Sequence, residues 1–264
     1  MKVAKNRFLV VTLFIILLSI LLYAREFLKQ NLFDHGINSY VSGISFQIIF
    51  NVLLITLALL LIRKFKLKNL AGLGNLKYSN WLLLIFPLYL VVFNVFNLED
   101  ISSYTAFEFV LFLIYTLSIG FSEELLLRGF LQSYLIKNTS KTKKNIFIAV
   151  FVSSLIFGLL HLLNFNKGIY GELGQIGFAT FIGVMFGTIL LRTKNMYAIA
   201  LLHACIDFAA KYDQIGVPFD LNKVVEESSL INTIAILIIV LPCLIYGIVL
   251  MRKYQFQTSV SKLN

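Results

Sequence analysis

Long apolar runs recur along the whole chain and constrain its fold more than any other feature. Runs of about seventeen or more residues are long enough to approach or span a bilayer as a helix. Hydrophobic residues make up 59% of the chain and charged residues 14%, whereas a soluble domain is about half apolar and a quarter charged. We therefore expect an all-α, polytopic membrane protein.

The runs predict about eight transmembrane helices in a single integral-membrane domain over residues 1–264. The fourth helix is expected to continue beyond its apolar part, towards residue 136. The expected spans are 8–24, 42–62, 81–97, 105–122, 146–164, 175–191, 196–210 and 231–250.

The charges between these runs alternate and predict a topology. Lys and Arg without any Asp or Glu occupy the N-terminal arm, the second, fourth and sixth connections and the C-terminal tail. The other four connections hold Glu26, Asp34, Glu99, Asp100, Glu172, Asp213, Asp220, Glu226 and Glu227. The positive-inside rule then places both termini in the cytoplasm. The net charge of +10 is thus a topological signal and a surface for anionic membrane lipid, and we expect no nucleic-acid partner.

Few ionisable residues remain inside the predicted spans. Each costs a few kcal/mol at the bilayer centre, so each needs a partner or a wet cavity and is a functional candidate. Glu108 lies near the outer end of the fourth span, where an interfacial position explains it. The others are Glu123, Glu124, Arg128, His161, His203 and Asp207.

The two adjacent glutamates are predicted to differ in role. Glu124 and Arg128 are four residues apart, the spacing at which helical side chains meet, so an ion pair makes both charges tolerable. Glu123 points about 100° away around the helix and is left over by this pairing. A carboxyl group in that situation is a candidate general base or acid.

Depth along the helices determines whether the remaining groups can join Glu123. Glu123 and His161 each lie roughly 20 Å along their helices from the turn that connects them. His203 and Asp207 lie about 10–16 Å along the seventh helix, and their i,i+4 spacing lets the acid orient the imidazole. A lone His161 would more often be a hydrogen-bonded core residue. Together, however, these groups predict one site in the cytoplasmic half to the middle of the membrane.

Three motifs carry these residues: EELLLR (Glu123–Arg128), FGLLH (Phe157–His161) and HACID (His203–Asp207). In order and spacing they resemble the motifs Glu-Glu-x-x-x-Arg, Phe-x-x-x-His and His-x-x-x-Asn/Asp. Those motifs define the CAAX-protease and bacteriocin-processing family (CPBP, also called Abi) of intramembrane proteases. The motif-bearing core is about 105–210, and the other spans match only as generic helices.

The resemblance implies an endopeptidase that cuts peptide bonds at the membrane. It assigns water activation to Glu123, and it matches the second glutamate and the arginine of the first motif to Glu124 and Arg128. His161 is expected to hold or polarise the water. It gives oxyanion stabilisation or metal binding to His203 and Asp207. Eukaryotic members typically have Asn where this chain has Asp207. A carboxylate cannot donate a hydrogen bond to an oxyanion, but it can orient His203 or bind a metal.

A metal-dependent version of the site stays open at this point. Two histidines and a carboxylate can form a Zn²⁺ shell, and the candidate ligands are His161, His203, Asp207 and Glu123. No His-Glu-x-x-His motif is present, so any such site would be assembled across helices. Water activation by Glu123 and His161 without a metal is the narrowly favoured alternative.

Three functions fit the sequence. The first is a CAAX-type endopeptidase in a bacterial plasma membrane, acting on a peptide or lipidated-peptide substrate in bacteriocin immunity or peptide-signal maturation. The second is a non-catalytic scaffold that regulates a sensor kinase or a toxin. The third is an ion-coupled transporter, against which stands the lack of repeat symmetry and of paired broken helices. The sequence does not predict the oligomeric state.

Overall fold

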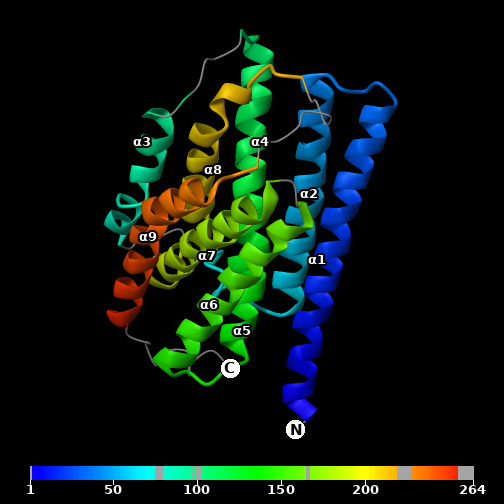
Figure 1. The fold of residues 1–264 in the computed structure, drawn as a ribbon. Coiled ribbons are helices and arrows are strands. Elements are labelled where there is room, and N and C mark those ends of the chain that lie inside the picture. The colour runs from blue at the N-terminus through cyan, green and yellow to red at the C-terminus, as the bar shows by residue number, and fades with distance from the viewer. Residues whose placement is uncertain are drawn as a thin grey trace.

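The computed structural model describes residues 2–74, 80–96, 98, 103–164, 167–218 and 227–254. These residues form a bundle of helices, and none of them lies in a β-strand (Figure 1). In this part of the chain, six helices are long and apolar enough to cross a membrane, and Trp81–Phe96 and Met196–Ala210 are shorter apolar helices. The prediction of an all-helical, multi-pass membrane protein is therefore confirmed, while six rather than eight helices reach the length of a span.

The helices follow one another with short connections. They are α1 (Lys2–Asp34), α2 (Tyr40–Lys64), η1 (Trp81–Leu84), α3 (Leu88–Phe96), α4 (Ala106–Glu124), η2 (Leu125–Gln132), α5 (Ser133–Lys137), α6 (Lys143–Leu160), η3 (His161–Asn164), α7 (Gly168–Thr193), α8 (Met196–Ala210), η4 (Tyr212–Gln214) and α9 (Leu230–Arg252).

Two helices extend further than their apolar runs predict. α1 continues beyond residue 24, because no Gly or Pro interrupts it before Gly36, which has a φ of 76°. Gln30 also donates a hydrogen bond of 2.8 Å to Asp34, four residues further along α1. α7 begins before residue 175, so Glu172 is buried inside the helix instead of lying in a loop. Apolar runs therefore mark the apolar centres of these helices and not their ends.

The third predicted span is broken. A 3₁₀ turn, η1, is followed by Pro87 and only then by α3. Proline has no backbone N–H and disfavours helical geometry in the residue before it, which favours a break between η1 and α3. The result is the shorter apolar segment Trp81–Phe96.

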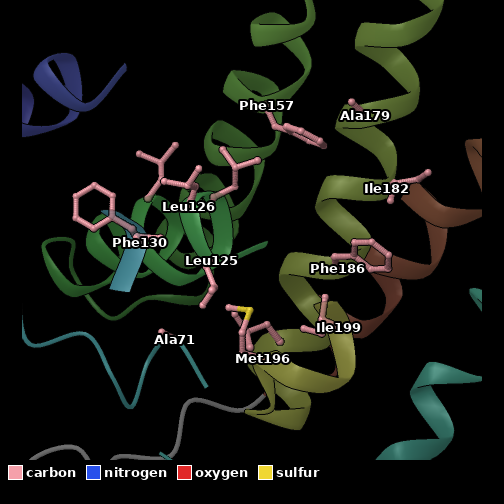
Figure 2. Close-up of a cluster of buried hydrophobic side chains, with 14 of the residues drawn as sticks. Ala71, Leu125, Leu126, Phe130, Phe157, Ala179, Ile182, Phe186, Met196 and Ile199 are labelled. Atoms are coloured by element: carbon pink, nitrogen blue, oxygen red, sulfur yellow. The ribbon is translucent and has the colours of Figure 1, made fainter. Parts of the chain in front are cut away.

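The stretch that joins α4 to α5 lies at the centre of the bundle. η2 has π-helical geometry, and all eight of its residues are buried. Ser133 Oγ donates a hydrogen bond of 2.9 Å to the carbonyl of Arg128, five residues earlier. Figure 2 shows Leu126 and Phe130 of η2 in one apolar cluster with Phe157 of α6, Phe186 of α7 and others. Single π-helical turns are frequent at functional sites, and this one directly follows the two glutamates.

Basic side chains gather at one end of the bundle, where they donate hydrogen bonds to carbonyls at the ends of other helices. The pairs are Arg7 with Asn138, Lys137 with Phe65, Lys143 with Arg252, and Arg192 with Lys253. These contacts bring the beginning of α1 and the end of α9 to the same end of the molecule (Figure 1). The basic segments that the sequence places on one side of the membrane do lie together.

Candidate active site

Glu124 bonds to two other members of the charged cluster. It is the last residue of α4, and its side chain is 0% exposed. Its Oε1 accepts a hydrogen bond of 2.9 Å from Arg128 Nη1 and one of 2.8 Å from His203 Nδ1. The predicted i,i+4 pair is therefore present. His203 of α8 is a second partner of Glu124, which the spacing alone did not reveal.

Arg128 is enclosed by aromatic rings and by a glycine. Its side chain is 1% exposed, and its guanidinium carbon lies 5.1 Å from the ring centre of Phe157 and 5.9 Å from that of Phe186. Cation–π contacts of this kind gain strength when water is excluded. A Cβ atom on Gly183 would lie 3.0 Å from Arg128 Nη2, so the site needs glycine there. Phe157 of the second motif thus has a structural role beside the arginine.

Glu123 faces a cavity of about 100 Å³. Its side chain is 33% exposed, and its Oε2 lies 3.6 Å from His203 Nε2, which is too long for a hydrogen bond. The cavity is lined mainly by leucines of α1, α2, η2 and α6, together with Arg25, Glu26 and His161. Glu123 is thus left out of the Glu124 pairing, as the spacing predicts, although His203 lies nearby.

His161 directly follows α6, as the first residue of η3, and lines the same cavity as Glu123. Its ring lies 5.0 Å from that of Phe157, and its Nδ1 lies 3.2 Å from Gln175 Nε2. An amide nitrogen only donates, so Nδ1 is the acceptor, and the proton of a neutral imidazole is then on Nε2. Gln175 of α7 therefore selects the His161 tautomer, and no motif spacing pointed to it.

His203 and Asp207 of α8 complete the cluster, but not with the predicted partners. Asp207 was expected to orient His203, yet its Oδ1 lies 3.9 Å from His203 Nε2. Glu124 orients the imidazole instead, and Asp207 Oδ2 pairs with Lys211 Nζ at 2.9 Å. Lys211 lies directly after the end of α8, and it follows Asp207 at the same i,i+4 spacing that revealed Arg128.

Two further differences concern α1 and α4. Arg25 and Glu26, which the sequence suggested were loop residues, form an ion pair of 2.8 Å on α1 and line the cavity. No local pattern could have revealed this, because α1 is far from α4 and α6 along the chain. Glu108 forms a capping box with Thr105 at the start of α4, which explains it without a role in the site.

The predicted metal ligands do not come together as a metal site. Among the residues that the structure describes, no group of three or more His, Cys, Asp or Glu side chains is arranged to hold a metal ion. His203 Nδ1 already bonds to Glu124, and Asp207 is paired with Lys211. His161, His203, Asp207 and Glu123 therefore do not fit a zinc shell in this arrangement, and no step below runs through one.

The comparison with known families agrees with the motifs. Residues 105–209 match the family described as type II CAAX prenyl endopeptidase Rce1-like. This segment contains all six candidate residues and covers the helices from α4 to α8. No curated protein and no solved structure matches the chain. The fold is that of an all-helical, multi-pass membrane protein, and its segment 105–209 is similar to the CAAX-protease type.

Proposed function

We propose that the chain is an intramembrane endopeptidase in which Glu123 activates the attacking water. One observation carries the proposal: Glu124 is buried with its Oε1 bonded to both Arg128 and His203, while Glu123 opens into a cavity that it shares with His161. Two adjacent carboxylates thus have separate tasks, one structural and one reactive.

In this mechanism Glu123 accepts a proton from a water molecule that His161 polarises. The water oxygen bonds to the carbonyl carbon of the substrate peptide, the carbon–nitrogen bond breaks, and Glu123 returns the proton to the leaving amine. With its Nδ1–H bonded to Glu124, His203 can donate from Nε2 only as an imidazolium. Three surrounding carboxylates favour that charge, and the Nε2–H is then suited to stabilise the oxyanion.

The setting of the reaction is part of the proposal. The basic end of the bundle is assigned to the cytoplasm by the positive-inside rule, and the membrane is a bacterial plasma membrane. The substrate is a peptide or lipidated peptide that reaches the cavity from the membrane. Bacteriocin immunity and maturation of a peptide signal are the pathways in which such cleavage fits.

The test compares membrane peptides from cells that produce the wild-type protein with those from cells that produce His161→Ala at the same level. We expect peptide termini that appear only with the wild type, because the variant can no longer polarise the water. Mass spectrometry of the membrane peptidome measures them. Identical termini in both samples would contradict the protease function and favour the non-catalytic scaffold.

A further inference from the structure

The charged cluster contains more carboxylates than the first motif explains. Glu123, Glu124 and Asp207 surround one imidazole, that of His203, at 3.6, 2.8 and 3.9 Å. Arg128 compensates Glu124 alone. A second cation is therefore needed to balance the remaining carboxylates, because uncompensated charges away from water are costly.

Lys211 supplies that cation from the residue that follows α8. Its Nζ lies 2.9 Å from Asp207 Oδ2, and both side chains are partly buried. The pair occupies one carboxylate oxygen, while the other stays 3.9 Å from His203 Nε2. This separation leaves Asp207 just beyond hydrogen-bonding distance of the imidazole.

The separation matters because Nε2 is the free donor of His203. Besides Lys211, the basic group that the structure places beside the Asp207 carboxylate is His203, whose Nε2 lies 3.9 Å from Oδ1. Without its ammonium partner, the carboxylate could turn to this nitrogen. A charge-assisted hydrogen bond would form between them, and the imidazole would no longer donate to a developing oxyanion. Glu124 would still hold Nδ1, so the ring would stay in place while its reacting face was blocked.

We propose that Lys211 is a positioning residue of this site, which holds Asp207 away from His203 so that the imidazole remains available to the substrate. The inference rests on the proposed peptidase function. It assigns to Asp207 and Lys211 a joint task that neither could perform alone. A neutral Asn at position 207 would form a weaker bond to the imidazole and would not need the lysine.

The experiment measures kcat and KM of the purified protein in lipid vesicles, using a peptide found to be cleaved by the wild type. Lys211→Met should lower kcat by about 100-fold, the scale of a small misplacement near the reacting atoms, with little change in KM. Lys211→Arg should keep most of the activity. Lys144→Met, at an exposed lysine in the first turn of α6, is the matched control and should behave as wild type.

A second substitution that restores kcat distinguishes a positioning role of Lys211 from a general loss of structure. Lys211→Met combined with Asp207→Asn should recover kcat relative to Lys211→Met alone, because the freed carboxylate is then gone. Contacting residues give non-additive effects, so the thermal unfolding midpoints of the wild type, Lys211→Met, Asp207→Asn and the double variant should also be coupled. That coupling reports the ion pair without any need for activity.

The outcomes are distinct. Wild-type kcat in Lys211→Met, or an equal loss in the double variant, would overturn the role of Lys211 while the peptidase stands. A wild-type protein that cleaves no peptide would overturn the proposed function and this role together. The coupled unfolding midpoints would then still show that the ion pair exists.

Discussion

Adjacent residues of one type can differ completely in their surroundings, and Glu123 and Glu124 do. Glu124 is 0% exposed and bonds to two partners, whereas Glu123 is 33% exposed and lines a cavity. The cause is the turn of about 100° between successive helical residues. The sequence predicted this division because one of the two partners, Arg128, lies on the same helix.

The buried pair at Glu124 makes a prediction about stability. Arg128→Met removes the cation and leaves a carboxylate that has no exposure to water. Breaking one partner of a buried ion pair typically costs about 3–5 kcal/mol, so we expect a clear drop in the unfolding free energy in detergent. Arg63→Met, at an exposed arginine in the last turn of α2, should change it little. Equal stability of both variants would contradict the structural role of Arg128.

Two contacts of the site that the sequence did not predict run between helices. The hydrogen bonds of Glu124 with His203 and of His161 with Gln175 join different elements, and residue spacing gives no information on such pairs. Asp207 with Lys211 is different, since both lie four residues apart. That pair could have been predicted from its spacing, but Lys211 lies one residue beyond the predicted span 196–210.

At the scale of helices, the site depends on how closely α4 approaches α8. A Cβ atom on Gly120 would lie 2.4 Å from the carbonyl oxygen of Ala200 and 2.9 Å from the backbone nitrogen of Ala204. These are backbone atoms that cannot move aside. Gly120 lies one turn before Glu124, and Ala204 directly follows His203, so this contact sets the Glu124–His203 distance.

Gly120→Ala should therefore force the two helices apart. We expect a loss of about 1–3 kcal/mol in stability, as for other overpacked cores, and a loss of peptidase activity through the disrupted Glu124–His203 hydrogen bond. Gly174→Ala is the matched control, because its Cβ would come no closer than 3.4 Å, to the Thr233 side chain. Thermal unfolding and peptide cleavage measure both variants. A fully active Gly120→Ala protein would show that the close approach is not needed.

The order of the helices was predictable, but some of their geometry was not. Met196–Ala210 coincides with the apolar run 196–210, and the helical extension of α4 reaches Lys137. The predicted ends of α1 and α7 were wrong, because polar residues can continue a helix where no Pro interrupts it. The π-helical geometry of η2 depends on packing from all sides, which no periodicity in the sequence records.

At the scale of the whole molecule, the cavity lies between two groups of helices. α1 and α2 contribute one wall, and α4, η2 and α6 contribute the wall with Glu123 and His161. The match with the Rce1-like family covers residues 105–209, so the first wall comes from outside the matched segment. Under the proposed function, α1 with its Arg25–Glu26 pair is therefore expected to influence which substrate the cavity accepts.

The central claim is that Glu123 is the reacting carboxylate, and Glu123→Gln tests it most directly. Glu108→Gln is the matched control on the same helix, because Gln can also complete a capping box. With both proteins purified at equal amounts and equal unfolding midpoints, we expect Glu123→Gln to abolish cleavage of a peptide that the wild type and Glu108→Gln cut alike. Peptide cleavage by Glu123→Gln at the wild-type rate would contradict the account.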